Sequence, residues 1–360
     1  PVPPVAEVRE KTNEKHGVKW GDPYAWMRER EDPKVIAYLE AENEYSSSVM
    51  NGTDGLQTEL YEEMLSHIDE NELSAPFLRG GHWYYSRNEE GKNYEIHCRK
   101  TGSLHAPEQV ILDENQLAAG KDYFSVGILE PSPNGKLLAY STDELGNERY
   151  TLRVLDLETG KHLPTEVKDT YYSVAWASDN KTLFYNRVDK ATRPHQLWRH
   201  EIGTDSAKDA LVYEEKDERY FLDAERSRSG EMILPSLGSQ VSTEVRFLDA
   251  KTPTGDFKII APRQEKVEYY VDHHTDRFYI VTNEEAVNFR LFEAKVANTE
   301  RSNWTELIPH REDVTLRSID AFANHLAIWE RQNGLPTLRV RDLKSGDEHA
   351  VEFPESAYAT

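Results

Sequence analysis

The stretch SPNGKLLAYSTDELGNERYTLRVLDLETGK, from Ser132 to Lys161, decides the fold because it reads as a β-hairpin with a further turn attached. Its turn sequences are Pro-Asn-Gly near the start, Gly-Asn in the middle and Thr-Gly near the end. Apolar residues from Leu137 predict a buried strand, and alternation of polar and apolar residues from Tyr150 to Leu157 predicts a second strand.

Related hairpins recur along the chain at a nearly constant period. With the apolar start of the second strand as the marker, successive copies are 56, 45, 48, 46 and 47 residues apart, at Ile96, Leu152, Leu197, Val245, Leu291 and Leu338. The preceding strand repeats in step as HWYYSR (82–87), KLLAYS (136–141), TLFYNR (182–187), EMILPS (231–236), RFYIVT (277–282) and HLAIWE (325–330). Six units of a repeat architecture are therefore expected.

A period near 45 residues with three or four short strands per unit is typical of a β-propeller blade. Helical repeats would show apolar residues at 3.6-residue spacing, which is not evident after about residue 75. An irregular β-sandwich is the alternative, but it does not predict constant spacing. The sequence thus predicts a mostly β protein with a propeller over residues 76–360, in which segment 103–123 is an irregular insertion.

Residues 1–75 have a different pattern and are expected to form an extended and helical arm. Asp32-Pro33 predicts a helix start, followed by an apolar stripe that includes Val35 and Leu39. A second helix is expected from Leu56 to about Ile68. Because a propeller rim offers little surface for two apolar stripes, we expect this arm to belong to a different body.

Composition limits the possible partners and location. Lys and Arg number 43 and Asp and Glu number 65, so the net charge of −22 disfavours nucleic acid and anionic membranes and favours cationic ligands. A single cysteine, Cys98, and the lack of a long apolar run predict a cytoplasmic protein. The chain starts at Pro1, so we expect a trimmed or processed start, and it stops about 14 residues after Gly346, where another repeat is expected.

Searches for catalytic and metal motifs lead to no assignment. The nearest string to G-x-S-x-G is Gly238–Ser242, which lacks the second glycine, and H-E-x-x-H, C-x-x-C and phosphate-binding glycine loops do not occur. We therefore assign no catalytic residue, no metal ligand and no cofactor. His273-His274 is expected in a solvated turn, since neighbouring residues on a strand point apart.

Other chemically suggestive residues are expected to be structural. Cys98 is predicted to be a buried, inert thiol on the same side of its strand as Ile96. Most repeat aromatics are expected to pack between blades: Tyr84, Tyr140, Trp176, Tyr185, Trp198, Tyr279 and Trp329. The acidic clusters are expected to form a solvated rim, although a binding role is left open: Asp143-Glu144, Glu148, Glu214-Glu215 and Asp217-Glu218.

The loops inside the six hairpins are expected to emerge on one face of the propeller, and docking or gating is expected to use one of its two faces. These loops are 87–93, 141–149, 187–196, 236–243, 283–288 and 331–336.

Several stretches resemble the prolyl oligopeptidase family of serine peptidases, in particular its oligopeptidase B (protease II) branch. HGVKWGDPYAWMRERED and VIAYLEAENEY are similar to the family's amino-terminal signature, and QLWRHEIGT, LVYEEKDERYFL and STEVRFLDA resemble the oligopeptidase B branch. The resemblance covers the arm and every repeat.

The resemblance implies the arm and the peptide-gating propeller, with about six of seven blades, of a cytoplasmic peptidase that cuts short peptides after Arg or Lys. Its partners would be an α/β-hydrolase domain, in the same polypeptide or a complementary chain, and short basic peptides. The family's catalytic triad and specificity carboxylates lie in that domain, so none is carried over. A free-standing propeller that acts as a binding scaffold is the alternative.

The resemblance also implies that hairpin loops face the hydrolase domain. Glu148, in GNERY, is then a candidate for an interdomain ion pair, although a solvated turn residue is an equal alternative. Arg187, Arg193 and Arg331 lie in equivalent loops and are candidates for the same interface.

Overall fold

The computed structural model describes residues 1–359, which divide into two compact units at Glu72/Leu73. Each unit is described by itself. The division lies three residues before the boundary expected after residue 75.

The first unit contains a short hairpin and two helices. Strands β1 (Thr12–Lys15) and β2 (Val18–Gly21) pair antiparallel. Helix α1 (Pro33–Met50) begins as the sequence predicts, because the Asp32 carboxylate accepts a 2.9 Å hydrogen bond from the Lys34 N–H and proline occupies the first turn. Helix α2 (Asp54–Ser66) starts and ends two residues earlier than expected.

Both helices leave apolar side chains exposed. Helix α2 has no buried residue, and α1 buries only Val35. The exposed apolar residues include Ile36, Leu39, Leu56, Leu60, Met64 and the following Ile68. The stripes that define these helices in the sequence are therefore uncovered in the described chain.

The second unit is built from antiparallel sheets whose strands follow chain order. Three four-stranded sheets at its carboxyl side contain β14 (Phe221–Arg226), β15 (Met232–Gly238), β16 (Thr243–Asp249), β17 (Lys258–Ile259); β18 (Tyr269–His274), β19 (Arg277–Thr282), β20 (Arg290–Lys295), β21 (Thr305–Ile308); and β22 (Val314–Ala321), β23 (His325–Gln332), β24 (Leu335–Asp342), β25 (Glu348–Ala350).

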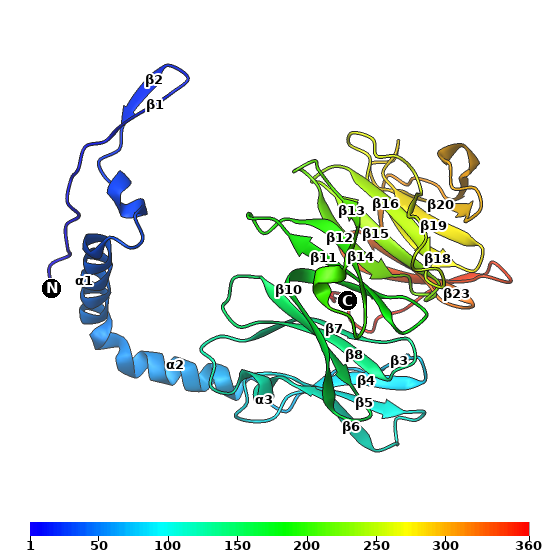
Figure 1. Ribbon diagram of the computed structural model, residues 1–360, viewed down its shortest axis with the longest axis horizontal. Coiled ribbons are helices and arrows are strands. Elements are labelled where there is room, and N and C mark those ends of the chain that lie inside the picture. Colours follow the sequence, from blue (N-terminus) through cyan, green and yellow to red (C-terminus); the bar gives the residue numbers. More distant parts are fainter. Residues whose placement is uncertain (360) are drawn as a thin grey trace. The chain divides into compact units, whose positions relative to one another are not determined.

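A four-stranded sheet and a seven-stranded sheet form the amino-terminal side of this unit. They contain β3 (Phe77–Arg79), β4 (His82–Arg87), β5 (Ile96–Thr101), β6 (Glu108–Asp113); and β7 (Ser125–Pro131), β8 (Leu137–Asp143), β9 (Tyr150–Asp156), β10 (Lys161–Trp176), β11 (Thr182–Val188), β12 (Pro194–Glu201), β13 (Ala210–Glu214). The 16-residue strand β10 runs through two repeat units and joins them into one sheet (Figure 1).

The hairpin repeat predicted from the sequence is confirmed. All six predicted strand pairs are antiparallel neighbours: β4–β5, β8–β9, β11–β12, β15–β16, β19–β20 and β23–β24. Among the described residues, each sheet takes its strands from one continuous part of the chain, so none is completed by a strand from the other end.

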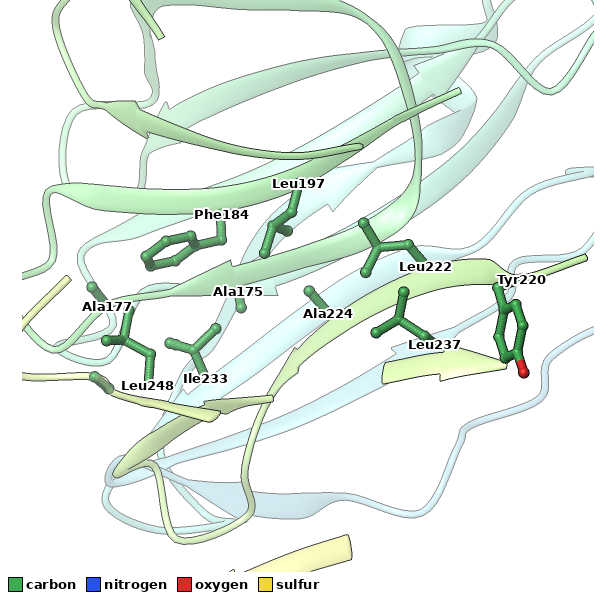
Figure 2. Close-up of a cluster of buried hydrophobic side chains, with 11 residues drawn as sticks. Ala175, Ala177, Phe184, Leu197, Tyr220, Leu222, Ala224, Ile233, Leu237 and Leu248 are labelled. Atoms are coloured by element: carbon green, nitrogen blue, oxygen red, sulfur yellow. The ribbon is translucent and has the colours of Figure 1, made fainter. Parts of the chain in front are cut away.

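Neighbouring sheets pack through apolar side chains that alternate along their strands. Figure 2 shows Phe184 and Leu197 of the seven-stranded sheet facing Leu222, Ile233 and Leu237 of the sheet that follows it. These side chains are at most 1% exposed, and their burial supplies the main attraction between sheets. Most of the repeat aromatics lie in such layers: Tyr84, Tyr140, Trp176, Tyr185 and Tyr279 are buried.

Two expectations about irregular regions are wrong. Segment 103–123 contains strand β6 and a short helix, α3 (Glu114–Ala118), whose N-cap Asp113 accepts hydrogen bonds from Asn115 N and Gln116 N. His273 lies on strand β18 and is fully buried, with Nδ1 2.8 Å from Ser229 Oγ, because it alternates inward against Phe278.

No helix in the described part of the chain is long and apolar enough to span a bilayer.

Candidate functional site: a loop face of the propeller

We define the loop face as the loops inside the six hairpins together with the connections that lead from one sheet unit to the next. Side-chain contacts join these two sets of segments. Arg149 Nη2, in the β8–β9 loop, donates a 2.8 Å hydrogen bond to Asp189 O in the β11–β12 loop. Asn288 Nδ2, in the β19–β20 loop, donates to Arg311 O and Glu312 O in the β21–β22 connection. These contacts join two of the six hairpin loops to each other and a third hairpin loop to a connection.

The β8–β9 loop is organised around a buried carboxylate. Asp143 is 1% exposed and accepts backbone hydrogen bonds from Leu145, Gly146 and Glu148 at 2.8, 3.0 and 2.8 Å. The expectation that Asp143 is solvated is wrong, because three N–H groups replace its water. The sequence signal for it is the Asp-x-x-Gly spacing of an Asx turn.

Glu148 is exposed at the end of this loop and has a left-handed backbone, with φ of 58°. Its carboxylate accepts a 3.3 Å hydrogen bond from the Tyr171 hydroxyl. Non-glycine residues adopt this conformation at a cost, which the three bonds to Asp143 offset. The loop therefore holds a charged side chain in a fixed place at the surface.

Arg187 and Arg331 differ in their surroundings. Arg187 is half-buried, with its guanidinium 4.7 Å from the ring centre of Trp198, and its Nε is buried with no hydrogen-bond partner among the described residues. Arg331 is exposed, and its Nε donates a 3.3 Å hydrogen bond to Gly334 O in its own turn. The first side chain is held by aromatic packing, whereas the second projects from the surface.

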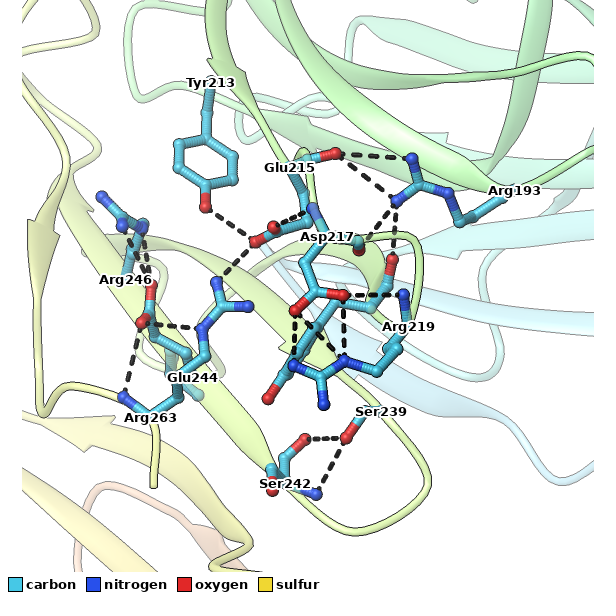
Figure 3. Close-up of polar contacts among 12 residues, drawn as sticks. Arg193, Tyr213, Glu215, Asp217, Arg219, Ser239, Ser242, Glu244, Arg246 and Arg263 are labelled. Carbon is cyan, nitrogen blue, oxygen red and sulfur yellow. Dashed lines mark hydrogen bonds and ion pairs between the residues drawn. The ribbon is translucent and has the colours of Figure 1, made fainter. Parts of the chain in front are cut away.

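Arg193 is buried and its guanidinium is already engaged inside the propeller. Nε lies 3.1 Å from Asp189 Oδ2, and Nη1 donates to the carbonyl oxygens of Glu215, Asp217 and Tyr220 at 3.4, 3.3 and 3.0 Å. It joins the β11–β12 loop to the β13–β14 connection (Figure 3). Of the four predicted interface residues, Glu148 and Arg331 are exposed, whereas Arg187 and Arg193 are held by contacts within the propeller.

A second arginine, Arg263, joins two buried carboxylates beside Arg193 (Figure 3). Its Nη2 contacts Glu215 Oε2 at 2.5 Å and its Nε lies 3.3 Å from Glu244 Oε2, while both carboxylates are about 5% exposed. Although burial acts to raise the pKa of Glu215, the hydrogen bonds from Arg263 and from Asp217 N lower it overall. The expectation that Glu215 is solvated is wrong, since this network replaces its hydration.

Strained backbone and exposed apolar side chains gather on the loop face. Thr192 and Phe289 have φ of 63°, an unusual conformation for a β-branched or bulky residue. Leu145, Val241 and Val287 lie in three of the hairpin loops and are 80%, 45% and 83% exposed. Fixed charges, strain and exposed apolar residues in one place are typical of an interaction surface.

The opposite end of the unit contains a cleft of ≈ 760 Å³ between the first strands of several sheets and their turns. Its walls contain the ion pairs Arg79–Glu130 and Arg228–Asp320. Burial, followed by nearby carboxylates, raises the pKa of Glu225, and burial raises that of Asp272. The cleft therefore contains charged side chains of both signs, and several of them are exposed, including Glu225 and Arg228.

A further group of three residues has the hydrogen-bond contacts of a nucleophile–base–acid triad, but a substrate cannot reach its hydroxyl group. Thr165 Oγ1 lies 3.2 Å from His200 Nε2, and His200 Nδ1 lies 2.7 Å from Asp209 Oδ1. Tyr185 donates a 2.8 Å hydrogen bond to the other Asp209 oxygen. Because Thr165 is 2% exposed and His200 is fully buried, no substrate can reach the hydroxyl in this conformation, and we interpret the group as a structural network.

Three possible metal ligands, Glu95, His97 and Glu114, also lie close together. Glu114 contacts His97 Nε2 at 2.7 Å, whereas Glu95 lies 3.9 Å from Nδ1 on the other side of the ring. The 2.7 Å contact between Glu114 and His97 Nε2 is a hydrogen bond that explains this arrangement without an ion, so we assign no metal centre here.

Comparison with known proteins identifies the family. A family model described as the prolyl oligopeptidase N-terminal β-propeller domain matches residues 3–360. The chain belongs to the prolyl oligopeptidase family. Dipeptidyl aminopeptidase BI of Pseudoxanthomonas mexicana is 37% identical over 99% of the chain and 52% of the relative. Protease 2 of Moraxella lacunata is 32% identical over 99% of the chain and 52% of the relative.

Solved structures of the prolyl oligopeptidase family match the same part of the chain. Oligopeptidase B from Leishmania major has a TM-score of 0.89 and 30% identity, and the match covers 99% of this chain and 54% of that one. Oligopeptidase B from Trypanosoma brucei, in a closed form with covalently bound antipain, has a TM-score of 0.89 and 28% identity, with 98% and 53% covered. The chain thus spans about half the length of these family members, and the resemblance to oligopeptidase B structures is confirmed.

Proposed function

We propose that this chain is the arm and substrate-gating propeller of a serine oligopeptidase that resembles oligopeptidase B. Joined to an α/β-hydrolase domain, it would hydrolyse short peptides after Arg or Lys in the cytoplasm. The chain itself would supply no catalytic residue. We further propose that its six hairpin units are six of seven blades.

The observation that carries this proposal is the match of residues 3–360 to an N-terminal propeller domain, when the chain spans about half of its relatives. The exposed apolar residues of α1 and α2 support it, because uncovered stripes on two helices need a partner surface. The hydrolase domain is the partner we propose for both the arm and the loop face.

In this proposal the loop face contacts the hydrolase domain when the enzyme is closed. Glu148 and Arg331 are the best placed of the predicted interface residues, because both are exposed and fixed by their turns. Arg187 and Arg193 stabilise the loop face through contacts within the propeller. A net charge of −22 would attract cationic peptides toward such an enzyme.

The relative named dipeptidyl aminopeptidase BI, at 37% identity, gives a second candidate for the substrate specificity of the joined enzyme. An enzyme of that type would need a free peptide amino terminus, whereas an endopeptidase would accept a blocked one. We favour the endopeptidase, because two oligopeptidase B structures match the chain with a TM-score of 0.89.

The test joins this chain to the hydrolase domain of a relative and measures cleavage of paired substrates. We expect cleavage of short Arg or Lys amides with blocked amino termini and none of a large folded protein. Cleavage only of substrates with a free amino terminus would favour the dipeptidyl specificity. If the joined protein is folded but inactive on every peptide, the peptidase proposal is wrong. Equal cleavage of the folded protein would contradict gating.

A further inference from the structure

A groove of ≈ 470 Å³ lies at the edge of the loop face, beside the β8–β9 loop and the β6–β7 connection, and away from the cleft at the opposite end. One wall is formed by α3 and the segment after it, and the other by strands β8, β9 and the first half of β10; α3, β8 and β10 are labelled in Figure 1. Its size is that of a small-molecule site. Its apolar wall is formed by Leu117, Phe124, Leu163 and Pro164.

Arg153 lies in the groove with its guanidinium held in place. It is on β9, between Tyr140 of β8 and Glu166 of β10 in the strand register. Nη1 donates a 2.9 Å hydrogen bond to Thr142 Oγ1, and Nε lies 3.6 Å from Glu166 Oε2. The ion pair with Glu166 is loose, and the planar fork of an arginine suits a ligand carboxylate.

A tyrosine–histidine pair forms another polar part of the groove. Tyr140 is 1% exposed, and its hydroxyl lies 2.6 Å from His162 Nε2. Burial raises the pKa of the Tyr140 hydroxyl. The second ring nitrogen of His162, Nδ1, has no hydrogen-bond partner in the described part of the chain, so it can contact a ligand.

Negative charge is present beside these donors. The side chains of Glu166 and Glu144 are 52% and 43% exposed, and Glu144 is paired with Lys121 at 3.3 Å. A simple anion would be repelled by the two carboxylates and by a net charge of −22, and a simple cation would be repelled by Arg153. A head group with both charges close together matches the adjacent opposite charges of Arg153 and Glu166.

We propose that this groove binds a small zwitterion with an apolar side group, namely a free hydrophobic α-amino acid or a short hydrophobic peptide. Its carboxylate is held by Arg153, its ammonium group by Glu166 and Glu144, and its apolar group lies against Phe124 and Leu163. The proposal does not rest on the peptidase function.

Isothermal titration calorimetry of the purified chain tests the proposal with L-phenylalanine, N-acetyl-L-phenylalanine, L-phenylalanine amide and the dipeptide glycyl-L-phenylalanine. We expect saturable binding of L-phenylalanine or the dipeptide, and the tighter of the two identifies the ligand source. Each blocked form loses one charge pair and is expected to bind roughly tenfold more weakly.

Matched variants locate the binding. Arg153→Gln and Glu166→Gln are each expected to weaken binding roughly tenfold. Arg277→Gln is the control, because Arg277 is also a strand arginine that pairs with a glutamate, Glu293, at 2.8 Å, but it lies outside the groove. Thermal melting establishes that each variant is folded. The proposal is overturned if neither zwitterion binds, if the blocked forms bind as tightly, or if the control loses as much affinity as the groove variants.

Discussion

Arg193 Nη1 donates a 3.0 Å hydrogen bond to the carbonyl oxygen of Tyr220, and so fastens a hairpin loop to the connection that enters the next sheet. The same guanidinium contacts Asp189 and two further carbonyl oxygens. A buried charge with this many partners stabilises the loop face more than an exposed pair would.

Replacement of Arg193 by alanine is expected to lower the free energy of unfolding by about 3 kcal/mol, because it leaves a carboxylate and buried carbonyl oxygens without their donor. Urea denaturation of the purified chain measures the effect. Arg219→Ala is the control, since Arg219 is exposed and its ion pair among the described residues is with the nearby Asp217, and little change is expected there. Equal effects of the two substitutions would contradict the structural role of Arg193.

Acid should weaken the network around Glu215. The pKa of Glu215 is lowered in the folded chain, so its ionised form contributes stability that is present above the unfolded pKa and is lost as pH falls through the folded value. Glu215→Gln should therefore lower the free energy of unfolding most near neutral pH. The difference in this free energy between the variant and the unmodified chain should decrease below pH of about 4. Urea denaturation across this range checks it. A difference in unfolding free energy that does not depend on pH would contradict the stabilising role of ionised Glu215.

The Thr165–His200–Asp209 group should behave as a structural network. Asp209→Ala removes the partner of both His200 and Tyr185, and we expect a loss of about 3 kcal/mol in the free energy of unfolding. Tyr185→Phe removes one hydroxyl and should cost about 1 kcal/mol. Equilibrium denaturation measures both values. A fully stable Asp209→Ala variant would rule out the structural interpretation.

Cys98 should be unreactive in the folded chain. It is fully buried, and burial together with the nearby Glu108 raises the pKa of its thiol to about 11. Because the thiolate is the reactive form, a chromogenic disulfide reagent should modify it slowly at neutral pH and rapidly in denaturant. Rapid modification without unfolding would show that the strand opens locally.

Glu148 provides a test of the proposed domain contact. Glu148→Gln should leave the stability of the chain unchanged, since the Asp143 carboxylate bonds to the backbone of Glu148 and the glutamine side-chain oxygen can still accept the hydrogen bond from the Tyr171 hydroxyl. In a chain joined to a hydrolase domain, we expect peptide cleavage to fall several-fold if Glu148 forms an ion pair there. Glu158→Gln, in the β9–β10 turn, is the matched control. An unchanged cleavage rate in Glu148→Gln would remove Glu148 from the interface.

The repeat could be read from the sequence because its signals are local. Turn residues such as Pro133-Asn134-Gly135 and the alternation after Tyr150 fix each hairpin within about 30 residues. The start of α1 at Asp32-Pro33 depends on residues that are neighbours in the chain. In each of these cases the deciding interactions lie within one turn or one strand pair.

The burial of Glu215 could not be read in this way. Glu215 looks like a solvated loop residue in the sequence, but its partner is an arginine 48 residues away. Arg193 likewise looks free to pair with another domain until the structure places the carbonyl oxygen of Tyr220 beside it. The burial of Asp143, by contrast, has a local signal in its Asp-x-x-Gly turn.

The sequence by itself determined the hairpin repeat, the helix start and the resemblance to the family, because turn chemistry, side-chain alternation and capping act between near neighbours. Only the tertiary structure decided which charged residues are buried and paired inside the propeller and which, like Glu148, remain at its surface. The physical reason is that the burial and pairing of a charge depend on long-range contacts, which no local pattern encodes.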